Sequence, residues 1–248
     1  MIPRNFVYTL LLQQSLMAAV CWSTGLMVRH GGVKVNYTRK LNHFMIMGTP
    51  FGLAMFLPYQ PNLITMSLRA TGFIAATLLL SQPVRRRFSM CQTAFLAIDR
   101  PEDRPHTLVW AVSQILVCAV VLAGLFVLMT SLGRPEFLMI PLVVTGIGDG
   151  LAEPVGVRFG RHRYRVPSLV RGRVYHRSIE GSLCVGLTAV AVVVALAGTL
   201  SGPQLAAMLG LVPIAMTLTE AWSPHTWDAP ALYAVGGLLP AAVVTWVP

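Results

Sequence analysis

Charged residues are scarce in this sequence, and acidic residues are the scarcest of them. Only 11% of the 248 residues are charged, whereas a soluble domain carries about 25%. Hydrophobic residues make up 55% of the chain, and the mean hydropathy is +0.66. Because so few polar groups cannot cover a globule in water, the composition excludes a soluble fold and predicts an integral membrane protein.

Cysteine is also rare, and its spacing excludes two further classes of protein. The four cysteines, Cys21, Cys91, Cys118 and Cys184, form no CxxC pair, so neither a disulfide framework nor a cysteine metal site is expected. The sequence has no internal repeat, low-complexity tract or long linker, which predicts a single domain over 1–248. The first apolar run is too long, and lacks a clear small-residue cleavage site, for a signal peptide.

Long hydrophobic runs, in contrast, are abundant. A helix needs about 20 apolar residues to cross a bilayer, and eight such runs predict an all-α bundle of eight transmembrane helices. The predicted segments are 6–28, 43–59, 62–82, 107–131, 136–156, 180–199, 203–222 and 230–247. The second segment is short and contains Pro50, so we expect it to be tilted or broken.

Basic residues predict the orientation of these helices. The formal net charge of +10 would suit a nucleic-acid partner, but the membrane composition favours basic loops facing the cytoplasm. Most of the Lys and Arg residues follow the first, third and fifth segments. The positive-inside rule therefore places these loops in the cytoplasm and both termini on the non-cytoplasmic side.

A glycine-rich motif, Thr145–Gly160, lies where the fifth segment meets its basic loop. Gly148 and Gly150 flank Asp149, and Glu153 follows one helical turn later, so the two acids share a helix face. A carboxylate at membrane depth normally has a partner or a task, and two oxygen ligands on one face suit Mg²⁺. The alternative is that the glycines are helix-packing notches and the acids pair with loop arginines.

A second motif precedes the sixth segment and contains Arg177, Ser178, Gly181 and Ser182. Arginine binds phosphate through two parallel hydrogen bonds, and free N–H groups at the start of a helix attract anions. The alternative is a positively charged helix flank with an ordinary cap. For the nearby Arg161, Arg163 and Arg165, solvated loop positions are the preferred interpretation.

A third motif contains Arg39, Lys40 and His43. Arg39 and His43 are four residues apart and Lys40 is adjacent, so these groups can surround a phosphate. A membrane-surface anchor explains the same residues equally well.

A fourth motif fills the connection after the seventh segment and contains Glu220, Trp222, His225, Trp227 and Asp228. The predicted alternation of loops places its two acids on the same cytoplasmic face as Asp149. The tryptophans are also typical of a membrane interface.

Together these motifs indicate a phosphoryl-transfer site at the cytoplasmic face. A nucleoside triphosphate with Mg²⁺ would arrive from water, and a lipid would arrive from the bilayer. Such chemistry depends on positioning and charge neutralisation more than on covalent catalysis.

The four motifs resemble those of the dolichol kinase and phytol kinase family of CTP-dependent lipid kinases, which is distantly similar to CDP-diacylglycerol synthases. The resemblance rests on Arg39-Lys40-x-x-His43, on Gly148-Asp149-Gly150 with its later glycines, on Arg177-Ser178-x-x-Gly181-Ser182, and on Glu220-x-x-Ser223-Pro224-His225-x-x-Asp228. It implies transfer of the CTP γ-phosphate to a long-chain prenyl alcohol such as phytol, a polyprenol or a dolichol. The sequence departs from the family pattern at two motif positions, where Arg177 replaces Lys and Ala229 replaces Asn.

The resemblance also implies roles for individual residues. Asp149, with Glu153, would hold Mg²⁺, and Glu220 or Asp228 would accept the hydroxyl proton. Phosphate-binding positions would be Arg39, Lys40, His43, Gly148, Gly150, Arg177, Ser178, Gly181 and Ser182.

Two other functions compete with a lipid kinase. A cytidylyltransferase would form a CDP-lipid from similar motifs, and a non-catalytic lipid-binding protein or transporter would need no nucleotide. The glycine faces also permit a homodimer.

Overall fold

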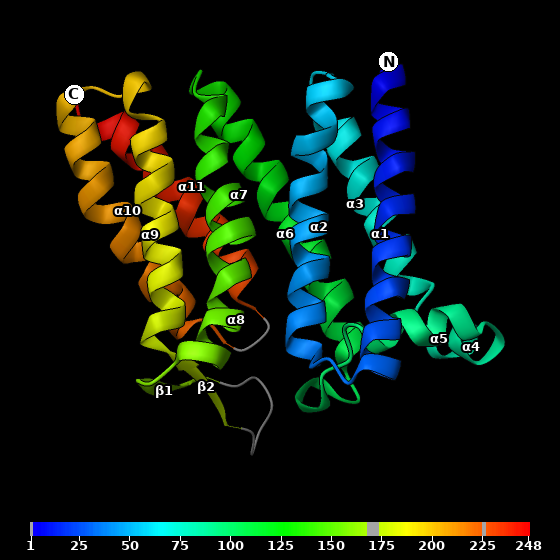
Figure 1. Cartoon of the computed structure of the whole chain (residues 1–248). Helices are drawn as coiled ribbons and strands as arrows, with labels where there is room; N and C mark the ends of the chain where they lie inside the picture. Colours follow the sequence, from blue (N-terminus) through cyan, green and yellow to red (C-terminus); the bar gives the residue numbers. More distant parts are fainter. Residues whose placement is uncertain (1, 168–173, 225–226) are drawn as a thin grey trace. The chain divides into compact units, whose positions relative to one another are not determined.

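A computed structural model describes residues 2–167, 174–224 and 227–248. The chain forms two compact units, Met1–Ala119 and Val120–Pro248, and each is described by itself (Figure 1). Both are helical, which confirms the predicted fold class at that level. The prediction of one domain over 1–248 stays a prediction.

The first unit is built around a long N-terminal helix. Helix α1 packs against α2, α3 and α5, and it ends where Gly32 adopts a left-handed conformation with φ 61°. The helices of this unit are α1 (Arg4–Gly31), α2 (Val35–Phe56), α3 (Leu63–Leu78), α4 (Gln82–Arg87), α5 (Ser89–Leu96) and the short 3₁₀ helix Pro101–Asp103. Helix α6 (Thr107–Ser131) then continues the chain from one unit into the next.

Helix α2 differs from the predicted segment 43–59, because it begins at Val35. The polar residues before 43 look like loop by hydropathy, but they lie on the first turns of the helix and several are buried. Asn42 donates to the Thr24 hydroxyl over 2.9 Å, and Thr38 donates to the Ala97 carbonyl over 2.9 Å. Helix α2 also continues through Pro50 to Phe56, so the expected break does not occur.

The third connection is also more structured than hydropathy predicts. It contains α4 and α5, followed by a turn held by two ion pairs, of which Arg100–Asp103 is buried. Asp99 accepts from the Arg104 guanidinium over 2.7 Å, and Asp103 accepts from Arg100 over 2.7 Å. These contacts fix the chain between α5 and α6.

The second unit is centred on α9, which packs against α8, α10 and the segment before α8. Its core includes Phe137, Ile140, Val185, Met208 and Met216, all fully buried. The elements are the 3₁₀ helix Pro135–Leu138, α7 (Met139–Val143), a π-helical turn (Val144–Asp149), α8 (Gly150–Phe159), β1 (Arg163–Val166), β2 (Tyr175–Ser178), α9 (Ile179–Ala195), the 3₁₀ helix Ala197–Thr199, α10 (Gly202–Trp222) and α11 (Asp228–Trp246).

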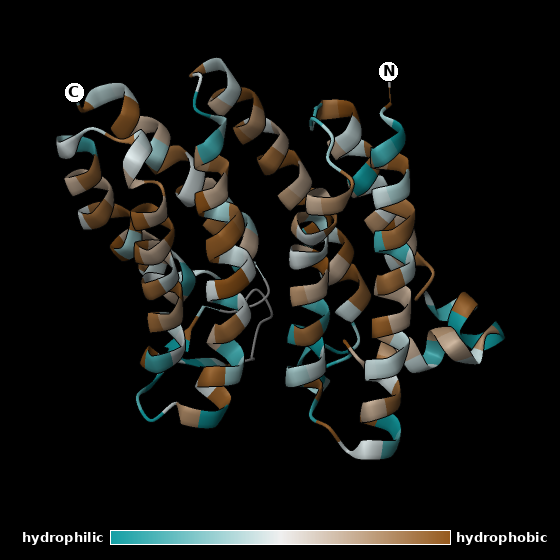
Figure 2. Cartoon of the chain, turned by 45° about the horizontal axis from the view of Figure 1, so that its top comes forward, coloured by the Kyte–Doolittle hydropathy of each residue, from teal (hydrophilic) through white to brown (hydrophobic). Residues whose placement is uncertain are grey.

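Five helical segments among the described residues are long and apolar enough to cross a membrane. They are Arg4–Gly31, Thr107–Ser131, Pro135–Phe159, Gly202–Trp222 and Asp228–Trp246, and Leu63–Leu78 and Ile179–Ala195 are shorter apolar helices. Figure 2 shows long hydrophobic stretches along the helices. The chain is therefore suited to be an integral membrane protein. Eight crossings, and termini outside the cytoplasm, stay predictions.

Candidate functional site

A short β-hairpin positions the arginine of the second motif. Strands β1 and β2 pair antiparallel, and Tyr164 lies directly opposite Arg177. Because side chains alternate along a strand, Tyr164 and Val166 point inward while Arg163 and Arg165 are exposed. The two side chains of one cross-strand pair thus reach the interior of the second unit together.

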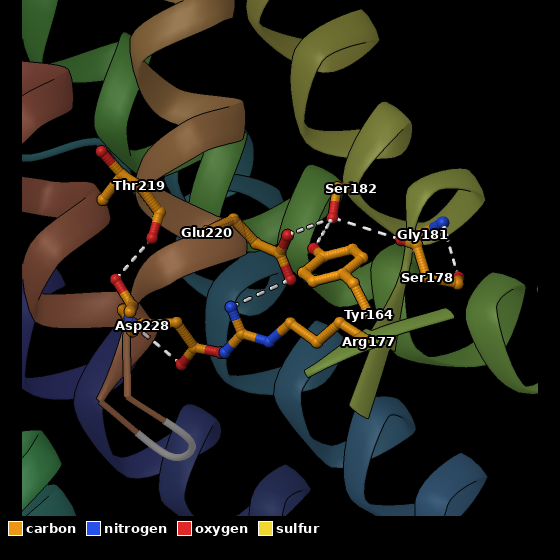
Figure 3. Close-up of polar contacts among 10 residues, drawn as sticks. Tyr164, Arg177, Ser178, Gly181, Ser182, Thr219, Glu220 and Asp228 are labelled. Atoms are coloured by element: carbon orange, nitrogen blue, oxygen red, sulfur yellow. Dashed lines mark hydrogen bonds and ion pairs between the residues drawn. The ribbon is translucent and has the colours of Figure 1, made fainter. Parts of the chain in front are cut away.

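Arg177 forms ion pairs with acids from two different helices (Figure 3). Its Nη1 lies 3.3 Å from Oε1 of Glu220 on α10, and its Nη2 lies 3.0 Å from Oδ2 of Asp228, the first residue of α11. The exposed fractions of these side chains are 12% for Arg177, 4% for Glu220 and 19% for Asp228. Arg177 therefore ties the hairpin to the ends of both helices.

The charge around Arg177 is dominated by carboxylates. Burial lowers the pKa of the Arg177 guanidinium, but attraction by Asp228, then Glu220 and then Asp149, outweighs burial and raises that pKa above its ordinary value. Asp149 thus acts on Arg177 from a third element, the π-helical turn. Three acids that are far apart in the sequence contribute to one electrostatic site.

A hydroxyl relay leads from the hairpin to Glu220. The Ser182 hydroxyl donates to Oε2 of Glu220 over 2.6 Å, and the Tyr164 hydroxyl contacts the same Ser182 oxygen. The Ser182 hydroxyl has one proton, for which Glu220 and the Ser178 carbonyl at 3.2 Å are both acceptors, so Tyr164 donates to Ser182 when that proton is used in either contact. Burial, followed by the charge of Glu220, raises the pKa of Tyr164, so this phenol stays protonated at neutral pH.

Ser178 is the N-cap of α9. Its side chain accepts from the backbone N–H of Gly181 over 3.1 Å, as capping serines do. This N–H, which the sequence assigned to a phosphate, is therefore engaged within the helix cap. The structure supports the alternative of an ordinary cap for Ser178 and Gly181, and their phosphate contacts stay a prediction.

Gly148 of the first motif and Gly181 of the second lie where α9 packs against the helical segment before the hairpin. A Cβ on Gly148 would approach Cα of Val185 to 3.0 Å, and a Cβ on Gly181 would meet the carbonyl oxygen of Ala152 at 2.6 Å. Both distances involve backbone atoms, so a side chain at Gly148 would force the π-helical turn away from α9, and one at Gly181 would force α8 away from α9. Gly148 and Gly181 are thus packing notches. The sequence offered this interpretation for the glycines of the first motif, such as Gly148, but not for Gly181.

Gly181→Ala is expected to lower the stability of the second unit. The added methyl overlaps the Ala152 carbonyl, and such overpacking costs about 1–3 kcal/mol. Thermal unfolding in detergent, followed by tryptophan fluorescence, measures the effect. Gly210→Ala on α10 is the matched control, because no atom lies within 4 Å of a Cβ there. Equal melting temperatures for the two variants would contradict the packing role.

Asp149 lies at the end of the π-helical turn Val144–Asp149, and it is 5% exposed. Such turns occur often at functional sites. Gly150 follows Asp149 and is buried, and Glu153, one turn later on α8, is half-buried. Pro154 has no N–H to donate to the carbonyl of Gly150, which loosens the helical hydrogen bonding next to Asp149.

The donor set suits magnesium only when a substrate supplies further ligands. Among residues 2–167, 174–224 and 227–248, no group of three or more His, Cys, Asp or Glu side chains is placed to hold a metal ion. Mg²⁺, however, commonly takes one or two carboxylates and fills its other positions with phosphate oxygens and water. The buried carboxylate of Asp149 fits that use, with Glu153 as a second donor.

The structure brings together only part of the predicted site. Direct contacts join Arg177, Ser182, Glu220 and Asp228 in the second unit, and Asp149 acts on Arg177 electrostatically. The third motif, Arg39, Lys40 and His43, lies on α2 in the first unit, where Lys40 is 5% exposed. Its grouping with the acids stays a prediction. His225 of the fourth motif lies outside the described residues.

Tyr164 is the site residue that sequence reasoning missed. It lies between arginines that were interpreted as solvated loop positions. The alternation of polar and nonpolar residues over 163–166 is nevertheless typical of a strand. That signal could have identified Tyr164 and Val166 as the inward-facing pair.

Comparison with known proteins gives one partial match. The chain is 44% identical over 64 residues to a phytol kinase of Synechocystis sp., and this stretch covers 26% of the chain and 25% of the kinase. No family model matches the chain, and no solved structure matches it. The match supports kinase-like chemistry. Because it is short, it does not identify the phosphoryl donor or the lipid acceptor.

Proposed function

We propose that this protein is a lipid kinase that transfers the γ-phosphate of CTP to a long-chain prenyl alcohol at the cytoplasmic face of the membrane. One observation carries the proposal. Arg177 lies among carboxylates from three separate helical elements, Asp149, Glu220 and Asp228. The partial similarity to a phytol kinase supports the same chemistry.

The charges around Arg177 suit the handling of a phosphoryl group. Arg177 presents a planar, permanently charged group, and such a group can exchange carboxylate oxygens for phosphate oxygens. Mg²⁺ held by Asp149 and Glu153 would neutralise charge on the triphosphate. Arg39, Lys40 and His43 on α2 stay predicted phosphate-binding residues.

Asp228 is the better candidate for accepting the proton of the lipid hydroxyl. Glu220 is 4% exposed, already accepts from Ser182, and forms an ion pair with Arg177. Asp228 is 19% exposed and begins α11, so a substrate can reach its carboxylate more readily. Glu220 then serves to hold Arg177 and Ser182 in place. Arginine at position 177, where the family has lysine, suits this arrangement, because a planar guanidinium can pair with Glu220 and Asp228 at the same time.

Labelled nucleotide tests the proposal directly. Purified protein with Mg²⁺, phytol or a polyprenol, and CTP labelled at the γ-phosphate is expected to yield a labelled lipid monophosphate. CTP labelled at the α-phosphate should leave the lipid unlabelled. Transfer of the α-label with release of pyrophosphate would instead identify a cytidylyltransferase.

A binding measurement separates enzymes from a non-catalytic membrane protein. A nucleotide present at 100 times its Kd adds about 2.7 kcal/mol of apparent stability. We therefore expect CTP with Mg²⁺ to raise the melting temperature in detergent, and ATP to raise it less. No shift with either nucleotide, together with no label transfer, would overturn the proposal.

A further inference from the structure

The first unit contains an open, strongly basic pocket that the proposed kinase site does not use. It has a volume of about 550 Å³ and lies between the C-terminal end of α1 and the α4–α5 arm, which Figure 1 shows beside that end of α1. Its lining includes Arg29, Arg85, Arg86, Arg87, Ser89 and Gln92. Among the residues that the structure describes, no acidic residue and no member of the Arg39–His43 motif lines this pocket.

Two of the four guanidinium groups are held in place by the protein. Arg29 donates from Nη1 to the Thr93 hydroxyl over 3.4 Å, and the Arg85 guanidinium lies 3.6 Å from the centre of the Phe95 ring. The Nε–H of Arg85 is buried and has no hydrogen-bond partner among the described residues. Because Arg29 and Arg85 are already held in position, an anion that enters the pocket can bind beside them without a large rearrangement of these arginines.

The surroundings of the pocket favour a lipid over a soluble anion. Phe88 and Met90, next to the arginines, are 57% and 62% exposed. Helix α1, which supplies Arg29 in its last turn, is one of the helices suited to cross the membrane. The pocket itself offers arginines and the apolar side chain of Leu96 to a ligand, and the exposed Phe88 and Met90 lie outside its lining on the same α4–α5 arm. This combination matches a phosphate headgroup joined to acyl chains.

We infer that this pocket binds the phosphate headgroup of an anionic phospholipid. The headgroup lies among Arg29, Arg85, Arg86 and Arg87, and the acyl chains lie along Phe88 and Met90. The interaction is independent of nucleotide and of the proposed transfer reaction. If these arginines only set the orientation of the chain in the membrane, their positive charge would suffice, and no fixed number of bound lipids would be expected.

Native mass spectrometry tests this inference. The full-length protein is exchanged into detergent that contains equal amounts of phosphatidylglycerol and phosphatidylcholine. We expect phosphatidylglycerol to be retained selectively, with one molecule bound most tightly. The double substitution Arg29→Gln/Arg85→Gln should weaken this binding at least about tenfold, because each charged hydrogen bond to phosphate contributes strongly.

Matched variants separate the pocket from general charge. Arg161→Gln/Arg163→Gln removes the same charge from exposed positions and should change phosphatidylglycerol binding less than twofold. Arg86→Gln/Arg87→Gln, at exposed positions on α4, gives a second test if the first double variant fails to fold. Equal binding by the pocket and control variants, or no preference over phosphatidylcholine, would overturn the inference.

Competition identifies the source of the phosphate. Millimolar inorganic phosphate or CTP should leave the bound phosphatidylglycerol in place, because neither supplies acyl chains to Phe88 and Met90. Displacement of the lipid by either anion would assign the pocket to a soluble phosphate compound and overturn the lipid assignment.

Discussion

Asp149→Asn is expected to lower the kcat of CTP-dependent phosphate transfer by ~10²–10³, the usual loss when one preorganised electrostatic group is removed from an active site. Asn has the same shape as Asp but carries no charge. It therefore removes both the proposed magnesium donor and the field that Asp149 exerts on Arg177. The initial rate of phosphate transfer is measured as a function of substrate concentration at several Mg²⁺ concentrations. The variant should also need more Mg²⁺ for half-maximal rate.

The control for this experiment lies on the same helical segment. Glu136 pairs with Arg134 over 3.7 Å in the 3₁₀ helix Pro135–Leu138, before α7. Glu136→Gln removes one negative charge far along the segment from Asp149, so transfer should be unchanged. An unaltered rate and unaltered Mg²⁺ requirement for Asp149→Asn would contradict the role of this carboxylate.

Arg177→Ala is expected to destabilise the second unit by about 3–5 kcal/mol, because removal of one partner leaves buried charges without compensation. The affected carboxylates are Glu220 and Asp228, which lie within 3.3 Å and 3.0 Å of the guanidinium. Thermal unfolding of the purified protein in detergent measures the loss. Arg177→Lys keeps the charge but not the planar fork, so its loss should be smaller.

Two further variants show whether unpaired charge is the cause. Adding Glu220→Gln and Asp228→Asn to Arg177→Ala removes the uncompensated carboxylates and should recover part of the lost stability. Arg161→Ala, at an exposed position, should change stability by less than about 0.5 kcal/mol. If the triple variant is no more stable than Arg177→Ala, packing of the arginine side chain, and not charge, sets its contribution.

Hydropathy was sufficient to predict the helical membrane fold, because long apolar runs need no information about distant contacts. It failed at α2, where the polar residues after Val35 are on a helix. Asn42 and Thr38 are buried there by hydrogen bonds to Thr24 and to the backbone of Ala97. These partners are distant in the sequence, so a window of neighbouring residues cannot reveal them.

The sequence was sufficient to predict which acidic residues belong to the candidate site, but not which residues they contact. A rare carboxylate in an apolar chain indicates a site, which identified Asp149, Glu220 and Asp228. The sequence did not show that Arg177 joins Glu220 to Asp228, or that Ser178 uses its hydroxyl to cap α9. Those choices depend on the register of the β-hairpin and on the packing of α9 with α8 and α10, which are properties of the folded chain.

The π-helical turn at Val144–Asp149 has a consequence for sequence comparison. A π-turn contains one residue more than an α-turn, and one residue rotates an α-helix by about 100°. A helical wheel drawn without interruption over 139–159 would therefore assign α8 side chains to the wrong face. Alignment with a relative that has a regular α-helix here requires a one-residue gap within the turn, placed before Gly150, so that Asp149 is compared with its spatial counterpart.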